Sequence, residues 1–393
     1  MKKSVAIVGL GYVGLPLAVA CAKSGFKTFG IDYDASRIEK LLRGESYIED
    51  VTTNSLTEII SSEKFIPSAD YSTIKSAQII VICVPTPLTQ KKLPDLSFLQ
   101  NAIENISPYL EPGSLVILES TVAPRTSRNE IIPLIEKYSK YSIDHYFYAF
   151  SPERTDPKNT KWNLNNTPKL VAGLNQESLK KATSFYSEFI NTIVECSSLE
   201  IAETAKLLEN SFRLVNISFI NEVSIFCQET GIDIEEVVRA ASSKPYGFMP
   251  FFPSIGAGGH CIPVDPIYLS EYAKSQGAPT NLIDLAVQIN QEMPSYYVKK
   301  VKNILGTLEG KRILVIGVSY KSGVSDVRES PVVSLIMGLR EQKASVDWHD
   351  DQVKVWKGEI SAKLSHNYDL AIVAIWHKNV DLTQLGDVQI IRI

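Results

Sequence analysis

The sequence contains few cysteines, and their spacing shows no pairing pattern. Only five occur in 393 residues, and none belongs to a Cys-x-x-Cys pair. A disulfide framework and a zinc site are therefore not expected, and we predict no metal ion. The small number and the wide spacing of the cysteines also fit a reducing cytoplasm, where thiols stay free. The five are Cys21, Cys83, Cys196, Cys227 and Cys261.

Positive charge is also limited. The chain carries 40 Lys and Arg against 44 Asp and Glu, a net charge of -4, and its basic residues are spread along the sequence. Nucleic acid is therefore not an expected partner, because binding its phosphates requires clustered cations. Long apolar runs are absent too, since none approaches the roughly 20 residues that span a bilayer. No membrane partner is expected either.

The first 21 residues, MKKSVAIVGLGYVGLPLAVAC, share features with a secretion signal. They contain two lysines, an apolar run and a small-residue ending. The run also contains Gly9, Gly11, Gly14 and Pro16, which a signal helix does not need and a nucleotide-binding turn does. We therefore interpret this segment as part of the fold.

Apolar runs alternate with helical patterns in the first half of the chain. We expect strands at Ser4–Val8, at KTFGID ending on Asp32, at Gln78–Val84, at Ser114–Ser120 and at HYFYAF. Continuous apolar strands between helices predict a parallel sheet covered on both faces, which is a doubly wound α/β domain. Ligands of such sheets collect at the carboxyl ends of the strands.

The second half of the chain changes pattern and then returns to the first one. A long amphipathic helix begins near Leu199 and is ended by Gly231, and further helices run to about residue 306. The segments ILVIGV, ASVDWHDD and YDLAIVAIWH then repeat the strand-and-loop pattern. The predicted fold class is α/β, with two Rossmann-like doubly wound domains joined by a central helical domain. The expected bounds are 1–196, 197–306 and 307–393.

A glycine-rich turn follows the first expected strand. Gly9, Gly11 and Gly14 make Gly-x-Gly-x-x-Gly at the start of a helix, where the backbone can approach a pyrophosphate and the helix N-terminus attracts its charge. Asp32 ends the second strand, where a carboxylate accepts hydrogen bonds from a ribose diol and repels a 2′-phosphate. The combination predicts NAD rather than NADP. The alternative is a tight turn beside a surface aspartate.

One cysteine lies in an unusual segment, GAGGHCIPVDP, which runs from Gly256 to Pro266. Asp265 followed by Pro266 has the pattern of an N-cap and a first helical residue, so Cys261 is expected just before a helix N-terminus. The positive end of that helix would make the thiolate more available. The alternatives are a structural cysteine and an aspartate that only caps. Burial is expected for the cysteines of apolar periodic segments, Cys21, Cys83 and Cys227.

Lys206 and Asn210 lie one turn apart on the long helix and so project from one face. They could place a cation and an amide donor at a developing oxyanion. The alternative is a solvated polar stripe that includes Glu203 and Glu209. A dinucleotide site together with a nucleophilic thiol is a specific pairing, because a thiolate adds to an aldehyde and the hemithioacetal can then lose a second hydride.

Taken together, these motifs resemble the UDP-glucose and GDP-mannose dehydrogenase family along nearly the whole chain. The matching segments, in the family order, are GLGYVGLPLA, VPTP, ESTVAP, SPER, the Glu-x-x-Lys-x-x-x-Asn of Glu203 to Asn210, GGHCIPVDP and GVSYKSGVSDVRESP. The resemblance implies a four-electron oxidation of the C6 alcohol of a nucleotide sugar to a uronic acid, with two NAD+. It also implies a cleft between the Rossmann-like domains and a dimer core formed by the long helix, so a homodimer or higher homo-oligomer is expected.

The resemblance also implies roles for individual residues. The implied catalytic residues are Cys261 as nucleophile, Lys206 with Asn210 as stabilisers of oxyanions, Asp265 with Thr121 as holders of a water for proton removal, and Glu153 as the carboxylate that activates the hydrolytic water. The implied cofactor-binding residues are Gly9, Gly11, Tyr12, Val13, Gly14, Asp32, Arg37, Pro85, Thr86, Ser120 and Thr121. The implied substrate-binding residues are Glu153, Arg154, Lys206, Asn210, Phe252, Ser254, Gly256, Gly258, Tyr320, Lys321 and Arg328, of which the last three meet the UDP.

The last domain has only Gly317 where a dinucleotide turn would stand, so a second NAD is not expected there. The segment GGHCIPVDP resembles the branch of the family that acts on UDP-N-acetylhexosamines. The segment KPYGFMPFFP resembles enzymes of surface-polysaccharide biosynthesis that act on UDP-N-acetylglucosamine. UDP-N-acetylmannosamine is the nearest rival substrate and UDP-glucose a more distant one. The sequence departs from the family at Arg125, where glycine is common, and at Ser254 and Ile255, where Gly-Pro is more usual.

Two other hypotheses stand beside this one. A two-electron hydroxyacid dehydrogenase would explain Gly9 and Lys206, but it assigns no role to Cys261 or to the last domain. A non-catalytic NAD-sensing protein would keep the fold without the chemistry.

Overall fold

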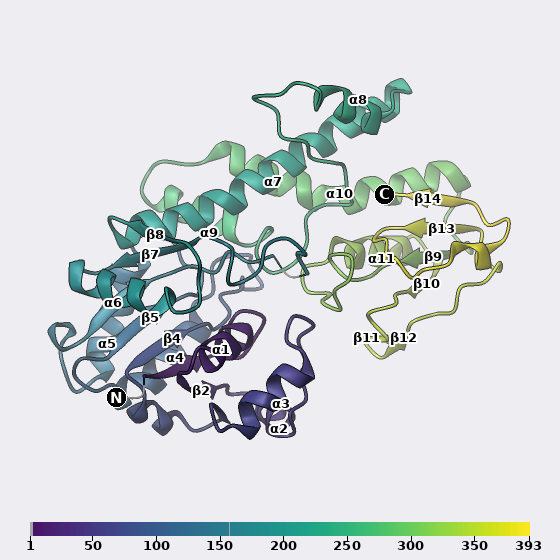
Figure 1. Cartoon of the computed structure of the whole chain (residues 1–393). Helices are drawn as coiled ribbons and strands as arrows, with labels where there is room; N and C mark the ends of the chain where they lie inside the picture. Colours follow the sequence, from purple (N-terminus) through teal and green to yellow (C-terminus); the bar gives the residue numbers. More distant parts are fainter. Residues whose placement is uncertain (1–2, 157) are drawn as a thin grey trace. The chain divides into compact units, whose positions relative to one another are not determined.

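The structure, a computed structural model, describes residues 3–156 and 158–393 (Figure 1). It divides the chain into two compact units, Met1–Leu208 and Glu209–Ile393, which we call the first and the second unit. Each unit is built around its own sheet. The predicted α/β fold class, with two Rossmann-like parts and a helical region, is confirmed.

The first unit contains an eight-stranded sheet in the order β3-β2-β1-β4-β5-β6-β7-β8. Neighbouring strands run parallel except β6 and β7. The expected parallel sheet is therefore wrong at this junction, where the described residues between the two strands, 151–156 and 158–168, form no crossover helix. The strands are β1 Ser4–Val8, β2 Lys27–Ile31, β3 Phe65–Ser68, β4 Ile79–Ile82, β5 Leu115–Leu118, β6 Phe147–Phe150, β7 Lys169–Gly173 and β8 Ile193–Cys196.

The sequence pattern does not predict β3. Its four residues, FIPS, include Pro67, which cannot donate a hydrogen bond to a neighbouring strand and is therefore confined to sheet edges. β3 is indeed an edge strand of this sheet. A short edge strand interrupted by proline gives little periodic signal, which explains why it was missed.

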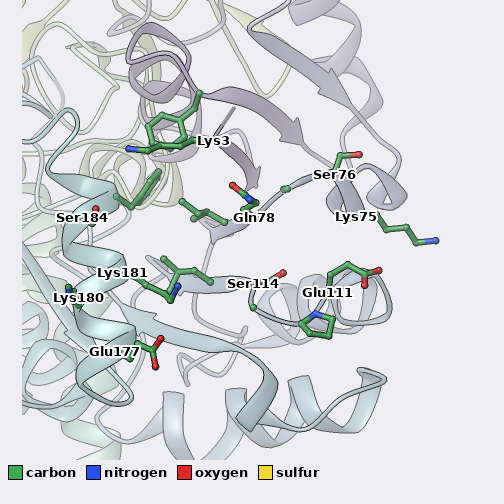
Figure 2. A pocket seen from close by; sticks show the side chains of 17 residues that line it. Lys3, Lys75, Ser76, Gln78, Glu111, Ser114, Glu177, Lys180, Lys181 and Ser184 are labelled. Atoms are coloured by element: carbon green, nitrogen blue, oxygen red, sulfur yellow. The ribbon is translucent and has the colours of Figure 1, made fainter. Parts of the chain in front are cut away.

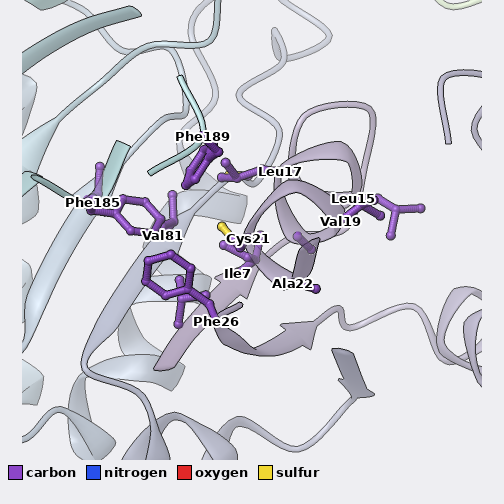
Figure 3. Packing of buried hydrophobic residues seen from close by; sticks show 14 of the residues in the cluster. Ile7, Leu15, Leu17, Val19, Cys21, Ala22, Phe26, Val81, Phe185 and Phe189 are labelled. Carbon is purple, nitrogen blue, oxygen red and sulfur yellow. The ribbon is translucent and has the colours of Figure 1, made fainter. Parts of the chain in front are cut away.

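Helices cover both faces of the first sheet. Along β1, Val5 and Ile7 face the cluster that includes α1, α3 and α6, whereas Ala6 and Val8 face the cluster of α4 and α5. Figure 3 shows the first cluster, where Cys21 lies among apolar side chains. The helices are α1 Gly14–Lys23, α2 Ala35–Leu42, α3 Thr53–Ser61, α4 Ser97–Ile106, α5 Ile132–Tyr138 and α6 Gln176–Tyr186.

The signal-like N-terminal segment is part of this fold. β1 is buried along its whole length between β2 and β4, and a turn at residues 9–13 connects it to α1. The interpretation of this segment as a strand, a glycine turn and a helix is therefore confirmed.

All five cysteines are free thiols. Cys21, Cys83 and Cys227 are buried, as expected, and Cys196 is partly buried. Burial raises the pKa of Cys21 and of Cys83 well above its ordinary value, so these two thiols stay protonated. Cys261 is the exposed thiol of the five.

The second unit combines long helices with a parallel four-stranded sheet in the order β10-β9-β13-β14. The predicted long helix is α7, Leu199–Thr230, which begins in the first unit. Helices α10 and α11 pack on one face of the sheet. The expected run of helices is interrupted by the irregular segment 242–264. The elements are α8 Ile234–Ala241, α9 Asp265–Ser275, α10 Asn281–Leu305, α11 Pro331–Glu341, β9 Arg312–Ile316, β10 Ser345–His349, β11 Val355–Trp356, β12 Glu359–Ile360, β13 Leu370–Val373 and β14 Ile390–Arg392.

Within residues 3–156 and 158–393, no helix has both the length and the apolar content of a membrane-spanning segment.

Candidate active site

The turn between β1 and α1 has the geometry that a dinucleotide site requires. Gly9 has a φ of 91°, in the left-handed region that favours glycine. A Cβ on Gly14 would lie 1.8 Å from the carbonyl oxygen of Gly9, so the turn can close only if this residue is glycine. Among the described residues, no heavy atom lies within 4 Å of a Cβ placed on Gly11. That open side leaves room for a pyrophosphate at the start of α1.

Asp32 fixes the same turn from the neighbouring strand. Its Oδ2 accepts hydrogen bonds from Leu10 N at 2.8 Å and Arg37 Nη1 at 3.1 Å, and its Oδ1 accepts one from Asp34 N at 3.0 Å. The side chain is buried, at 3% exposure, so the alternative of a surface aspartate is wrong. A carboxylate held here accepts ribose hydroxyls and repels a 2′-phosphate, and the residues present therefore fit NAD.

Three more loops leave the same edge of the first sheet, because β1, β4, β5 and β6 are parallel neighbours. Thr86 and Ser120 are both buried, and Ser120 Oγ donates to Val84 O at 2.6 Å, which ties the loops after β4 and β5 together. The predicted site residues at this edge are Gly9, Gly11, Tyr12, Val13, Gly14, Asp32, Arg37, Pro85, Thr86, Ser120, Thr121, Glu153 and Arg154.

A cavity of about 700 Å³ lies at the opposite edge of the sheet (Figure 2). It is lined by residues at the starts of β4 and β5, such as Gln78 and Ser114, and by Lys180 and Lys181 of α6. None of the predicted site residues lines it. Since ligands of these sheets bind at the carboxyl ends of the strands, we place the candidate site at the carboxyl edge.

Glu153 belongs to a buried ion-pair network that the sequence does not indicate. Its Oε2 lies 3.2 Å from Nζ of Lys169, the first residue of β7. The same ammonium lies 3.2 Å from Oε1 of Glu119, which directly follows β5. Glu119 Oε1 also accepts a hydrogen bond from the hydroxyl of Tyr186 on α6. Phe150 at the end of β6 pairs with Ala172 near the end of β7, and because the two strands are antiparallel the start of β7 lies beside the residues that follow β6, where Glu153 stands.

The network sets the charge of Glu153. Burial by itself would raise the pKa of this carboxyl, but the Lys169 ammonium and the hydrogen bonds from Thr155 outweigh it and lower the pKa to about 2. Glu153 is therefore a firmly ionised carboxylate, with one oxygen on Lys169 and the other on the Arg154 and Thr155 N–H groups.

The start of α7 contributes Glu203 and Lys206 to the first unit. Glu203 is buried, and its carboxylate accepts hydrogen bonds from Arg125 N at 2.6 Å and Ser127 N at 2.9 Å. Lys206 is only 8% exposed. The alternative of a solvated polar stripe is therefore wrong for both residues. Glu203 instead fixes the turn that follows Thr121.

Cys261 lies four residues before Asp265, the first residue of α9, and so stands close to the helix N-terminus, as predicted. Its carbonyl oxygen accepts hydrogen bonds from Val264 N at 3.1 Å and Asp265 N at 2.9 Å, which joins the cysteine to the first turn of the helix. The prediction that Asp265 is the N-cap is wrong, because Asp265 is the first helical residue and Val264 precedes it without a side-chain cap. Asp265 is buried and accepts a hydrogen bond from Asn210 Nδ2 at 2.5 Å.

Two buried asparagines hold the segment that precedes the cysteine. Asn221 on α7 accepts a hydrogen bond from Ser254 N at 2.8 Å. Asn290 on α10 accepts one from Ala257 N at 2.6 Å and donates one to Ala257 O at 3.0 Å. Sequence reasoning missed both, and their only signal is a polar residue on the apolar side of a helix. Phe252, predicted to contact substrate, is exposed in this segment.

The loop after β9 packs against the glycines beside Cys261. A Cβ on Gly258 would lie 3.0 Å from Tyr320 Cβ, and one on Gly259 would lie 2.8 Å from the Tyr320 ring. These glycines therefore permit a contact that any side chain would block. His260 lies between them and the cysteine, and burial followed by the charge of Arg328 lowers its pKa.

The structure thus gathers the predicted residues into two groups, one in each unit. The first unit holds the dinucleotide turn, the loops after β4, β5 and β6, and Lys206. The second unit holds Asn210, Phe252, Ser254, Gly256, Gly258, Cys261, Asp265, Tyr320, Lys321 and Arg328.

Comparison with known proteins gives a consistent result along the chain. Three models of the UDP-glucose/GDP-mannose dehydrogenase family match: its NAD-binding domain at residues 3–190, its central domain at 200–292 and its UDP-binding domain at 314–389. A UDP-N-acetyl-D-glucosamine 6-dehydrogenase of Pseudomonas aeruginosa is 36% identical over 89% of this chain and 83% of the relative. A UDP-N-acetyl-D-mannosamine dehydrogenase of Methanocaldococcus jannaschii is 33% identical over 88% of this chain and 79% of the relative.

A solved structure of a UDP-D-ManNAc dehydrogenase from Pyrococcus horikoshii superposes with a TM-score of 0.91 at 29% identity. It covers 99% of this chain and 95% of that one. Matches of this identity and length and the three domain models all indicate the same enzyme family. The chain is an NAD-dependent enzyme that belongs to the UDP-glucose/GDP-mannose dehydrogenase family.

Proposed function

We propose that the protein oxidises the C6 alcohol of a UDP-sugar to the carboxylic acid, in a four-electron reaction that passes through a thioester on Cys261. The observation that carries the proposal is the setting of this thiol. It is exposed, it is joined to the first turn of α9, and its loop packs against the loop of the UDP-binding domain that holds Tyr320. A two-electron dehydrogenase would need none of these three features.

The chemistry balances as two hydride losses and one hydrolysis. When bound, NAD+ supplies a hydride acceptor, and two molecules are reduced for each sugar oxidised. The C6 alcohol first loses a hydride and its hydroxyl proton and becomes an aldehyde. The Cys261 thiolate then forms a carbon–sulfur bond to the aldehyde carbon. Lys206 and Asn210, one turn apart on α7, donate hydrogen bonds to the alkoxide.

The hemithioacetal loses the second hydride and a proton and becomes a thioester. Water then attacks the thioester carbon, the carbon–sulfur bond breaks, and the thiol and the free acid are released. Asp265 and Thr121 hold the water that takes the hydroxyl proton from the alcohol. Glu153 acts in the hydrolysis step. Because its pKa is about 2, the carboxylate is a weak base, and we propose that its main role is to orient the attacking water.

The UDP-sugar is proposed from the family resemblance and from the names of relatives. The relatives include enzymes named for UDP-N-acetyl-D-glucosamine and for UDP-N-acetyl-D-mannosamine. We propose UDP-N-acetylglucosamine as the substrate, in surface-polysaccharide synthesis, with the mannosamine epimer as the nearest alternative. We retain three functional domains at 1–196, 197–306 and 307–393, and the five free thiols support a reducing cytoplasm as the compartment.

A homodimer is proposed from the surface of α7. Phe212, Phe219 and Phe226 follow one another at seven-residue spacing in the second unit, and they are 49%, 59% and 59% exposed. Three phenylalanines on one helical stripe are typical of a face that packs against another helix. We propose that α7 of a second copy covers this stripe.

A Cys261→Ser variant tests the thioester route. The serine side chain is a far weaker nucleophile, so we expect formation of the uronic acid to fall at least a thousandfold while NAD binding changes less than twofold. Cys196→Ser is the matched control and should keep the rate of the unaltered protein. Product is measured by mass spectrometry, and NAD binding by calorimetry. Undiminished acid formation by Cys261→Ser would overturn the mechanism.

A further inference from the structure

The second unit repeats the backbone geometry of the NAD turn, although it lacks the glycine motif. Gly317 follows β9 with a φ of 84°, as Gly9 follows β1 with a φ of 91°. The N–H of Gly317 donates to His349 O at 2.8 Å, and the N–H of Gly9 donates to Ile31 O at 2.7 Å. Both contacts link the turn to the end of the neighbouring parallel strand.

An aspartate occupies the same place in both turns. Val318 N donates to Oδ2 of Asp350 at 2.8 Å, just as Leu10 N donates to Oδ2 of Asp32 at 2.8 Å. Each aspartate directly follows its strand, β10 or β2. Asp350 is therefore the positional counterpart of the acid that meets the ribose in the first unit.

The two aspartates differ in what covers them. The side chain beside Asp32 is that of Arg37, which is 39% exposed and can swing aside for a ribose. The side chain beside Asp350 is that of His377, which is 2% exposed, and Asp350 is itself fully buried. His377 Nε2 lies 3.2 Å from Asp350 Oδ2. Asp350 therefore makes its contacts within the protein, because the imidazole of His377 fills the place where a ribose would lie.

His377 joins both ends of the loop 318–323. Its Nδ1 accepts a hydrogen bond from Gly323 N at 3.2 Å, so its proton lies on Nε2, which faces Asp350 Oδ2 and, at 3.3 Å, Ser319 Oγ. Asp350 Oδ2 in turn accepts hydrogen bonds from the N–H groups of Val318 and, at 3.2 Å, Ser319. The start and the end of the loop are thus fixed to one buried pair.

Hydrogen bonds keep the buried Asp350 ionised. Burial alone would raise the pKa of Asp350, but the hydrogen bond from His377 and those from the N–H groups of Val353 and Gln352 lower the pKa to about 2. The carboxylate therefore stays ionised and keeps its acceptors. The loop between the two fixed ends carries Tyr320 and Lys321, and the Tyr320 ring lies against Gly259 in the cysteine loop.

We propose that His377 and Asp350 are positioning residues that hold the loop 318–323 in the shape that binds the UDP moiety. The inference rests on the proposed UDP-sugar chemistry and adds to it two residues that touch no substrate. It also gives a physical reason why the second Rossmann-like part takes UDP in place of a dinucleotide.

The experiment measures UDP binding by calorimetry, with NAD binding and steady-state kinetics alongside. His377→Leu removes the hydrogen bonds to Gly323, Asp350 and Ser319, and we expect UDP affinity to fall about tenfold or more and KM for the UDP-sugar to rise by a similar factor. NAD affinity should change less than twofold, and kcat should fall much less than KM rises. His377→Gln, which can still donate to Asp350, should recover part of the loss. His366→Leu, an exposed histidine of the same domain, is the matched control.

A milder variant keeps the inference testable if His377→Leu folds poorly. Ser322→Ala removes only the hydrogen bond from Ser322 Oγ to Trp376 O, which is 2.6 Å long and fastens the same loop, and it should weaken UDP about threefold. UDP affinity unchanged in both variants would overturn the positioning role and leave the proposed function standing. Failure of the unaltered protein to bind UDP at all would overturn the proposed function as well.

Discussion

At the scale of single residues, Lys169 determines the charge at the carboxyl edge of the first sheet. Its ammonium is 4% exposed and lies 3.2 Å from both Glu119 and Glu153. Burial raises the pKa of Glu119, so this carboxyl depends on the ammonium to stay ionised. A buried charge that loses its partner is costly, typically by about 3–5 kcal/mol.

Replacing Lys169 by methionine should therefore destabilise the first unit. We expect the free energy of unfolding to fall by about 3 kcal/mol, because two buried carboxyls lose their common cation. The matched control is Lys180→Met, an exposed lysine on α6, which should stay within about 0.5 kcal/mol of the unaltered protein. Urea unfolding followed by circular dichroism gives both values, and equal stability of the two variants would contradict the account.

The same network predicts a pH dependence. The folded pKa of Glu153, about 2, lies below its ordinary value of 4.5, so its contribution to stability is present above about pH 5 and is lost as the pH falls toward 2. Without Lys169 the folded pKa is higher and this loss becomes smaller. Unfolding free energies between pH 7 and pH 3 should therefore fall less steeply in Lys169→Met, and parallel curves would argue against the ion pair.

At the scale of elements, the turn between β5 and the helical segment at 127–138 shows how α7 helps to build the site. The carboxylate of Glu203 accepts hydrogen bonds from both Arg125 N and Ser127 N. Arg125 has a φ of 67°, in the left-handed region where a residue with a side chain is strained. The family resemblance implies glycine at this position, where the sequence has arginine. The tie to Glu203 keeps arginine in a conformation suited to glycine.

Arg125→Gly should relieve that strain. We expect the free energy of unfolding to rise by about 1 kcal/mol, with the hydrogen bonds to Glu203 retained. Arg125→Ala is the matched control, because it removes the same charge and keeps the side-chain penalty, so it should give no gain. Thermal and urea unfolding decide between the two, and equal effects of glycine and alanine would show that charge matters here and backbone strain does not.

The sequence predicts those elements whose signals are local. The turn of Gly9 to Gly14, the helix α7 and the place of Cys261 before α9 follow from neighbouring residues, through glycine spacing, periodicity and a proline. β3 was missed because Pro67 interrupts its pattern. The antiparallel turn into β7 and the true N-terminal residues of α9 were missed because loop geometry decides them.

The site residues that escaped prediction act through contacts between distant segments. Lys169 meets Glu119 only because β5, β6 and β7 are neighbours, and His377 meets Asp350 only because β13 and β10 both pair with β9. No motif marks such pairs in a single sequence. A single histidine or a single asparagine on the apolar side of a helix seldom indicates a functional site, so reasoning from neighbouring residues assigns it no role.

At the scale of the whole molecule, the proposed dimer depends on the phenylalanine stripe of α7. Phe219 is the middle residue of the three. Phe219→Lys places a charge where a second helix would pack, so we expect a protein that is dimeric at micromolar concentration to become monomeric. Leu285→Lys, at an exposed apolar position of α10, is the matched control and should leave the assembly intact. Light scattering after size-exclusion chromatography measures the mass, and an unchanged mass would rule out this face.

The most direct test of the central claim counts the NADH formed for each sugar consumed. The account requires two hydride losses from the same carbon with Cys261 attached between them, so a limiting amount of UDP-N-acetylglucosamine should yield two NADH per sugar and no free aldehyde. The unaltered protein is assayed with NAD in excess, with absorbance for NADH and mass spectrometry for the sugar. One NADH per sugar, with aldehyde accumulating, would contradict the thioester route and would indicate a two-electron dehydrogenase.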